Sequence, residues 1–351
     1  MDAFFEANFS DLANEPTLLG NTLNHSSIAK GSLNKALSTT TASLSIAGTL
    51  AIFATFWMWP DLRTNSRRMI VFISVGDFLV AGANIVGLWG TSPGPSVGCR
   101  IQAAVGAIAL LFSFFWTVYL SLYFYLIICR GISLEREKRV LRLFHVTALG
   151  IPLTIAMICL ALEGFGYAGN VCSSGWCWIS NDQAWWMMVL WMCVTGKAWE
   201  MIAYITIPIF YVLVKTHIRR QVSAGFLPGS PFITVRSVEV AKRADQKLIL
   251  IPVVFILVHI WGTIRFFRFL ACLPDCQNTG PSHALQVLVI LQGIGDNSQG
   301  FANFLLFCFF SKKIRERFQQ LCGRHQRIFF NSVEEDPLLR STNSYGSIDY
   351  K

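Results

Sequence analysis

The stretch Ile101–Cys129 reads IQAAVGAIALLFSFFWTVYLSLYFYLIIC and contains no Asp, Glu, Lys or Arg. It is longer than the about 20 apolar residues with which an α-helix crosses roughly 30 Å of hydrocarbon. Charged residues return at both ends, with Arg100 before the stretch and Arg130 after it. The stretch therefore predicts a membrane-spanning helix, and similar apolar runs on either side of it extend that prediction to the whole chain.

The composition of the chain agrees with a membrane protein. Of 351 residues 53% are hydrophobic and 14% are charged, against about 25% charged in soluble domains. Mean hydropathy is +0.49. We expect an all-α membrane protein, a seven-transmembrane helix bundle whose single domain covers 36–310. The predicted spans are Ala36–Trp59, Met69–Leu88, Ile101–Cys129, Leu143–Leu162, Trp185–Val214, Leu248–Leu270 and Ala284–Phe310.

The basic residues predict the orientation of the bundle. Of the 29 Lys and Arg residues, 23 lie in the segments after the first, third, fifth and seventh spans. Such segments are cytoplasmic by the positive-inside rule, which places the N-terminus outside. Glycosylation sequons at Asn8 and Asn24 lie in the tail 1–35, the predicted extracellular segment. The net charge of +9 does not indicate a nucleic-acid partner, because the basic residues form short clusters between apolar runs.

The second outer loop contains SSGWCWISNDQAWW (Ser173–Trp186). Cys177 and Cys99, which opens the third span, are a candidate disulfide pair in oxidising surroundings. This bridge would draw the loop over the mouth of the bundle, where Trp176 and Trp178 form an apolar roof. Trp185 and Trp186 are then expected at headgroup level.

Other cysteine pairings stay open. Cys172 is an alternative partner for Cys99, and Cys272 and Cys276 around the third outer loop are a further candidate pair. Four cysteines in or beside the spans are expected to pack as small apolar residues. These are Cys129, Cys159, Cys193 and Cys308.

Polar residues inside spans are costly, so each is a candidate functional residue. Asp77 and Asn303 lie at similar depths, which predicts a polar network between the second and seventh spans. It acts either as a structural link or as a conformational switch or ion site.

A second set of charges is expected near the outer mouth. Lys197 and Glu200 share a helix face, and Arg265 and Arg268 lie at comparable height. We expect these four to converge, with Asp296 nearby, either as an anchor for a polar ligand or as mutual ion pairs.

The segment after the seventh span predicts a short amphipathic helix over 311–322 with a basic face for the inner lipid surface. Cys322 is a candidate palmitoylation site. The remaining tail, 323–351, is expected to be disordered. It contains an acidic dileucine-like signal at Leu338 and Leu339 and a tyrosine-based one at Tyr345, which suggest clathrin adaptors as partners.

Several strings resemble G-protein-coupled receptors. The Cys-Trp of the second outer loop and Gln299-Gly300-Phe301 are similar to the secretin-type branch, whereas Ser74-Val75-Gly76-Asp77 resembles a rhodopsin-type element. This mixture is typical of the cyclic-AMP-receptor-like group. Closer similarity to that group lies in Trp59–Arg63, Ser113–Val118, Gly175–Ile179, Thr195–Met201 and Asp245–Leu248. The chain departs from rhodopsin-type receptors because it has no Asp/Glu-Arg-Tyr triplet and no Asn-Pro-x-x-Tyr.

The resemblance implies a receptor that passes an extracellular signal to a heterotrimeric G protein, with Gq and phospholipase C favoured. It implies an unknown extracellular ligand at Trp176, Trp178, Lys197, Glu200, Arg265 and Asp296. It implies G-protein contacts at Arg130, Arg219 and Lys247, and arrestin as a further partner. We expect residence in the plasma membrane, with cilia or endosomes as alternatives.

No catalytic residues, metal site or cofactor are expected. The seventh span lacks a lysine for a retinal Schiff base, and only His259 among the six histidines lies clearly within a span. The alternative function is a transporter that uses the intramembrane charges as a polar path.

Overall fold

The computed structural model describes residues 31–90, 96–167, 173–225, 235–272, 283–311 and 314–320. Within these ranges the chain is almost entirely helical. The long helices are α2 (Ser32–Met58), α3 (Asn65–Gly90), α4 (Val97–Ile128), α5 (Leu134–Ala161), α7 (Ala198–Gly225), α8 (Val235–Cys272) and α9 (His283–Phe304). The short elements are η2 (Pro60–Leu62), β1 (Phe165–Gly166), β2 (Trp178–Ile179), α6 (Trp185–Met192) and the π-helical turns η3 (Cys193–Lys197) and η4 (Leu305–Phe309).

Among the residues that the structure describes, six helices are long and apolar enough to cross a membrane. They are α2, α3, α4, α5, the continuous run Trp185–Gln221 through α6, η3 and α7, and Leu250–Ala271 within α8. The expected multi-pass, all-α membrane protein is confirmed at this level. The helix expected as the seventh span, α9, is not among the six because amide and carboxylate side chains interrupt its apolar residues.

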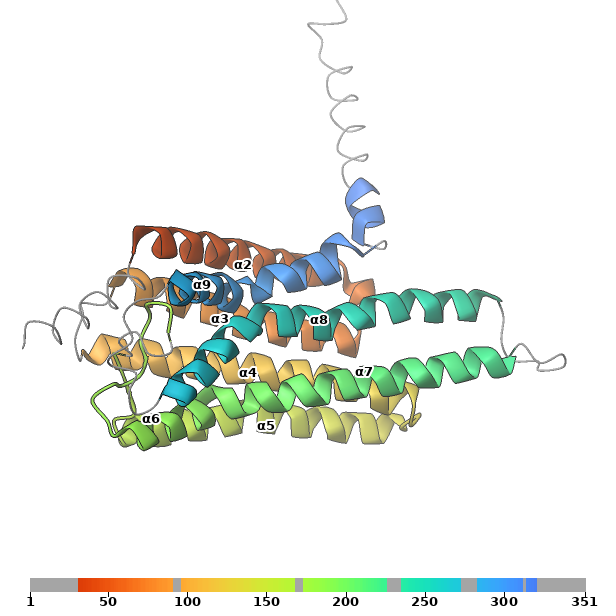
Figure 1. Cartoon of the computed structure of the whole chain (residues 1–351). Coiled ribbons are helices and arrows are strands. Elements are labelled where there is room, and N and C mark those ends of the chain that lie inside the picture. Colours follow the sequence, from red (N-terminus) through yellow and green to blue (C-terminus); the bar gives the residue numbers. More distant parts are fainter. Residues whose placement is uncertain are drawn as a thin grey trace, which may run out of the picture.

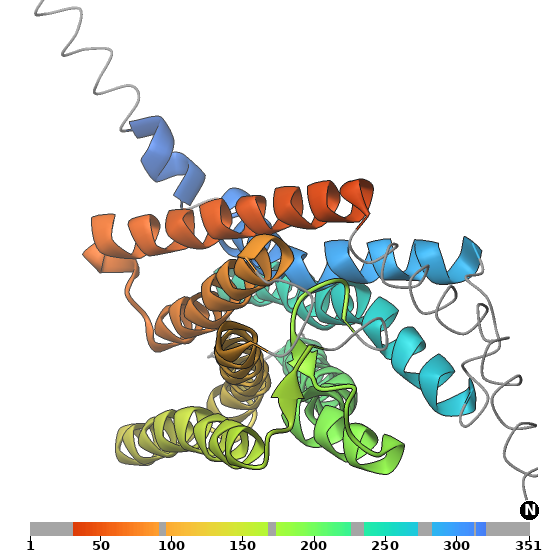
Figure 2. The ribbon, with the colours of Figure 1, turned by 90° about the vertical axis from the view of Figure 1, so that its left-hand side faces the viewer.

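The helices form one bundle around α4. This helix packs against α3, α5 and α7, and it also contacts both short strands. The ring of helices closes through α9, which packs against α2 and α8. Figure 1 shows the bundle from the side, with α9 between α2 and α8. The view along the bundle in Figure 2 shows the two strands over its centre.

The helices extend beyond the predicted spans, mostly at the end where basic residues gather. The helix α5 begins at Leu134 instead of Leu143, and α8 begins at Val235 instead of Leu248. Apolar runs mark only the part of a helix inside hydrocarbon, whereas charged residues such as Glu and Lys also favour helix in water. The fifth span is not uniform, because the π-turn η3 interrupts it at Cys193–Lys197.

Proline lies within three of the helices. Pro208 and Pro252 are inside α7 and α8 as expected, and Pro152 is inside α5. A proline removes one backbone hydrogen bond of its helix, so these are the positions at which each helix bends most easily.

The helix at 314–320 follows η4 and turns away from the direction of the bundle (Figure 1). Ile314 is buried against the bundle, and the ring of Phe318 packs edge-on against Trp59 at 5.0 Å. Arg317 forms an exposed ion pair of 2.8 Å with Asp61 of η2. These contacts hold the helix against the turn between α2 and α3.

Candidate functional site

A plug of loop residues, 173–177, fills the mouth of the bundle at the end opposite helix 314–320. Ser173 and Ser174 are fully buried. The Ser174 hydroxyl donates to the Val289 carbonyl of α9 at 2.7 Å, and the Asn34 amide of α2 donates to the Ser174 carbonyl at 2.7 Å. The plug is therefore bonded directly to α2 and α9, two neighbouring helices of the ring.

The disulfide holds the other end of the plug. Cys177 is joined to Cys99 in the first turn of α4, with their Cα atoms 5.5 Å apart. The Cys177 backbone N–H donates to the Gln102 side chain at 3.0 Å, one turn further along α4. Trp178 then enters β2, which pairs antiparallel with β1. The structure thus has the Cys99–Cys177 bridge among the described cysteines, whereas Cys172 and Cys276 lie outside the described residues.

The tryptophans of this loop lie in different environments in the structure. Trp176 is buried, and a Cβ added at Gly87 of α3 would lie 2.6 Å from the Cβ of Trp176. Gly87 therefore provides the space into which Trp176 packs. Trp185 and Trp186 are 57% and 54% exposed, as side chains at headgroup level would be.

Beneath the plug lies a cavity of about 60 Å³. Trp176, Cys177 and Trp178 line it together with polar residues of the helices, which include Lys197, Glu200, His259, Gln292 and Asp296. Sites that enclose drug-sized ligands measure about 300–1,000 Å³. A ligand larger than a few atoms therefore needs the plug or the helices to move before it can enter.

Two of the residues that line this cavity form a buried ion pair. Lys197 and Glu200 lie 2.7 Å apart, at the junction of the π-turn η3 and α7. Glu200 also accepts hydrogen bonds from Tyr204, at 2.8 Å, and from Thr263 of α8. The Glu200 carboxylate is thus held by three side chains: Lys197, Tyr204 and Thr263. Such pairing and hydrogen bonding is how a buried charge is stabilised.

The local fold explains why Lys197 reaches the interior. A π-turn contains one residue more than an α-helical turn and displaces the side chains that follow it. Gly262 of α8 provides the space, because a Cβ there would lie 3.1 Å from the Lys197 ammonium nitrogen. Any larger residue at this position would crowd the lysine.

Arg265 has partners other than those expected. Its guanidinium donates to the Ser173 carbonyl at 3.2 Å and to the side-chain oxygen of Gln292. It joins α8 to the plug and to α9, and it is not among the residues that line the cavity. Arg268 is exposed, so the expected convergence of four charges is wrong for this residue. Sequence spacing did not indicate the direction in which α8 presents its two arginines.

Asp296 connects the ion pair to α9. It accepts a 3.0 Å hydrogen bond from Gln292, which in turn accepts from Arg265. Asp296 also interacts electrostatically with Lys197, Glu200 and His259. The outer half of the bundle therefore contains one connected set of polar groups that extends from the plug to α7, α8 and α9.

A second polar network lies deeper in the bundle around Asp77. The Ser113 hydroxyl of α4 donates to one carboxylate oxygen at 2.6 Å, and Asn303 of α9 donates to the other at 2.7 Å. Gln299 donates to Ser113 at 3.1 Å. Asp77 and Asn303 are thus brought together, and Ser113 and Gln299 are additional members that the sequence reasoning missed.

A signal for these missed residues is present in the sequence. Gln292, Asp296, Gln299 and Asn303 recur along α9 at the spacing that keeps side chains on one helix face. Their hydrogen bonds connect them to α3, α4 and α8. This row, here called the polar face of α9, links the outer cavity with the deeper network.

At the basic end of the bundle, Arg130 is exposed just beyond α4 and Arg219 is exposed on α7. Lys247 belongs to α8, but its side chain lies outside the described residues. The Glu137 carboxylate of α5 accepts from Tyr123 of α4 at 2.8 Å and from Asn65 of α3 at 2.5 Å. This joint between three helices was not expected. Other predicted sites lie outside the described residues: Asn8, Asn24, Cys322, Leu338, Leu339 and Tyr345.

Comparisons with known proteins agree with this architecture. A family model described as slime mold cyclic AMP receptor matches residues 28–224, from before α2 to the last turns of α7. G-protein coupled receptor 157 of Homo sapiens is 39% identical over 80% of this chain and 81% of its own length. The Mus musculus protein of that name is 37% identical over 80% of this chain and 83% of its length.

A more distant relative is cyclic AMP receptor-like protein A of Dictyostelium discoideum. It is 27% identical over 40% of this chain and 35% of its own length. These matches confirm the resemblance that the strings in the loop and spans indicated. The chain therefore belongs to the slime mold cyclic AMP receptor family and is a relative of G-protein coupled receptor 157.

Proposed function

We propose that the chain is a seven-span G-protein-coupled receptor with its N-terminus outside and its C-terminus in the cytoplasm. The observation that carries the proposal is the similarity to G-protein coupled receptor 157 over 80% of the chain. In this proposal α9 is the seventh span, since its polar face is turned into the bundle and hydrogen-bonds to α3 and α4. Residues 1–35 form the outer tail, 36–310 the bundle, 311–322 a membrane-parallel helix and 323–351 a disordered tail.

The signal is proposed to enter at the cavity beneath the plug. A ligand that displaces Trp176 or Trp178 would come into contact with Lys197, Glu200 and Asp296. Because the polar face of α9 continues from Asp296 to Asn303, a shift at the cavity is proposed to reach the network around Asp77. Arg265 is proposed to affect ligand binding indirectly, because it hydrogen-bonds to the Ser173 carbonyl of the plug and does not line the cavity.

The partners follow from this role. A heterotrimeric G protein would bind at the basic end, with Arg130, Arg219 and Lys247 as contacts and Gq with phospholipase C as the first route to test. Asn8 and Asn24 are proposed glycosylation sites, Cys322 a palmitoylation site, and Leu338, Leu339 and Tyr345 signals for clathrin adaptors. We place the protein in the plasma membrane, with cilia and endosomes as further destinations and arrestin as a further partner.

The proposal is tested in cells that lack individual G-protein families. Inositol phosphate and cyclic AMP are measured for the wild-type chain and for Arg130→Ala at equal surface expression. A signal restored by one G-protein family, and reduced in Arg130→Ala, supports the receptor. Proton or solute flux through well-expressed protein without any G-protein response would instead favour a transporter.

A further inference from the structure

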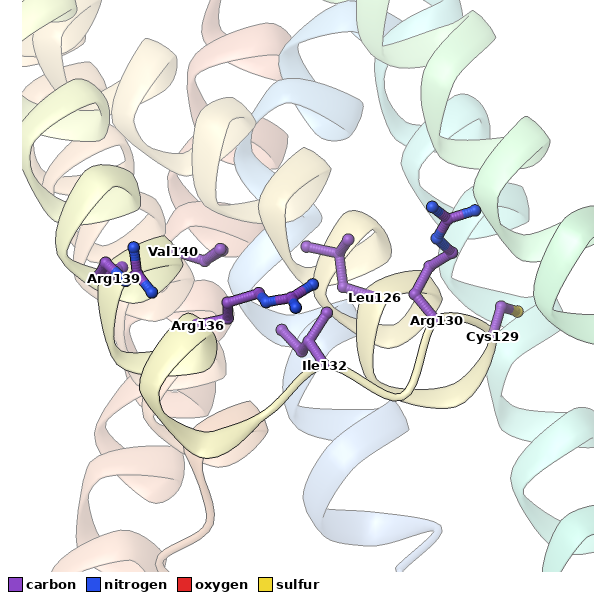
Figure 3. A pocket seen from close by; sticks show the side chains of 7 residues that line it. All are labelled: Leu126, Cys129, Arg130, Ile132, Arg136, Arg139 and Val140. Atoms are coloured by element: carbon purple, nitrogen blue, oxygen red, sulfur yellow. The ribbon is translucent and has the colours of Figure 1, made fainter.

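A pocket of about 630 Å³ opens where α4 ends and α5 begins. Leu126, Cys129, Arg130 and Ile132 line it from the α4 side, and Arg136, Arg139 and Val140 line it from α5. Figure 3 shows Arg136 extending from α5 toward Leu126, with Arg130 on the other side of Leu126. The pocket thus has an apolar floor with guanidinium groups on both sides.

The turn between the two helices shapes this pocket. Gly131 has a φ of 54°, a left-handed conformation that favours glycine, and it reverses the chain directly after Arg130. The turn therefore places Arg130 and Arg136 at the same opening although they belong to opposite walls.

The positive charge of the pocket is not neutralised by neighbouring carboxylates. None of the three arginines forms an ion pair within the part of the chain that the structure describes. The half-buried carboxylate of Glu137, next to Arg136 in sequence, accepts hydrogen bonds from Tyr123 and Asn65. The pocket is therefore a strongly basic site.

An apolar surface continues from the pocket along α5. Arg136 and Leu143 are seven residues apart, as are Arg139 and Val146, so these four side chains lie on one helix face. Leu143 is 59% exposed and Val146 is 70% exposed, which in a membrane protein means contact with acyl chains. The face changes from guanidinium to aliphatic within two turns, as a phospholipid changes from headgroup to acyl chain.

We propose that this pocket binds the phosphorylated headgroup of an anionic phospholipid, with its acyl chains along Leu143 and Val146 of α5. Arginine forms bidentate, charge-assisted hydrogen bonds with phosphate oxygens, and three arginines favour a headgroup with more than one phosphate. A free phosphate would use the arginines but not the apolar face. This inference uses only one part of the proposed function, the orientation of the chain, which assigns the lipid to the cytoplasmic leaflet.

The test measures binding of a fluorescent phosphatidylinositol bisphosphate to the full-length chain purified in detergent. Arg136→Gln/Arg139→Gln is compared with Lys138→Gln/Arg142→Gln, which removes the same charge from α5 at residues that do not line the pocket. Arg130 is left unchanged because it is a proposed G-protein contact. Unlabelled diacylglycerol, inorganic phosphate and soluble inositol trisphosphate are used as competitors.

The pocket variant is expected to weaken binding about tenfold or more, and the control variant by less than about threefold. None of the three competitors should displace the lipid as well as unlabelled phosphatidylinositol bisphosphate does. Equal losses in the two variants would show general charge attraction and overturn the proposal. Displacement by inositol trisphosphate as effective as by the lipid would show a site for a soluble anion, and displacement by diacylglycerol would show an acyl-chain site.

Discussion

Asn303 of α9 donates a 2.7 Å hydrogen bond to Asp77 of α3, although 226 positions separate the two residues in the chain. The same carboxylate accepts from Ser113 of α4. One buried side chain therefore connects three helices of the bundle, and it lies at the inner end of the polar face of α9. An exchange of the two residues tests how much this hydrogen bond stabilises the bundle.

Asp77→Asn is expected to lower the thermal midpoint because a neutral amide has one acceptor oxygen where the carboxylate accepts from both Ser113 and Asn303. Asn303→Asp alone places two carboxylates side by side. Each single change should cost about 1–3 kcal/mol of unfolding free energy, as expected for an unsatisfied buried group. The exchange Asp77→Asn/Asn303→Asp restores one donor and one acceptor, so its thermal midpoint should exceed that of both single variants. If the exchanged variant is no more stable than the weaker single variant, the hydrogen bond does not contribute as described.

Loss of one charge from the buried pair of Lys197 and Glu200 should destabilise the protein far more than loss of one charge from an exposed pair. Glu200→Gln leaves the Lys197 ammonium buried without its carboxylate, which should cost about 3–5 kcal/mol. The rim pair of Arg100 and Glu163, whose carboxylate side chain is 72% exposed, is the matched control. Glu163→Gln should cost less than about 1 kcal/mol. Thermal unfolding in detergent measures both, and similar losses would argue against a buried ion pair.

Adding Lys197→Met to Glu200→Gln gives a further check on this pair. Removal of both charges eliminates the uncompensated ammonium, so the double variant should be more stable than Glu200→Gln alone. Strictly additive losses would mean that the two charges act independently.

Two glycines of α3 test the packing between α3 and α4. A Cβ at Gly76 would lie 2.8 Å from the Ser113 Cβ and 2.9 Å from the Ala109 carbonyl oxygen, whereas a Cβ at Gly82 would meet nothing within 4 Å. Gly76→Ala should therefore destabilise the bundle, by about 1–3 kcal/mol for an overpacked site. Gly82→Ala should be neutral or stabilising by up to about 1 kcal/mol. The reverse order of thermal midpoints would contradict the described approach of these helices.

The disulfide closes a separation of 78 residues between α4 and the plug. Its removal by Cys177→Ser should cost about 2–5 kcal/mol. Cys99→Ser should cost a similar amount, and the double variant should be little worse than either, because all three lose the same bond. Cys193→Ser is the control, since Cys193 is a free cysteine in η3. Fully additive losses from Cys99 and Cys177 would show that they are not partners.

The long apolar helices and the buried charges Lys197 and Glu200 could be predicted from the sequence, because long apolar runs and isolated charges are local signals. The sequence predicted a contact between Asp77 and Asn303 from depth alone. It did not predict the π-turn before Ala198, which packs against α4 and α5, nor the direction of Arg265, which depends on how α8 is rotated. The hydrogen bond between Tyr123 and Glu137 was also not predicted, because Glu137 is one charge among several in a polar segment.

The most direct test of the receptor uses the full-length chain reconstituted in lipid nanodiscs with purified heterotrimeric G proteins. The rate of nucleotide exchange is measured for each G-protein class with the wild-type chain, with Arg130→Ala and with empty nanodiscs. We expect at least one class to exchange nucleotide faster with the wild-type chain than with empty nanodiscs. Arg130→Ala should reduce this acceleration while its thermal midpoint is unchanged. Folded protein that accelerates exchange in no class would contradict the proposed function.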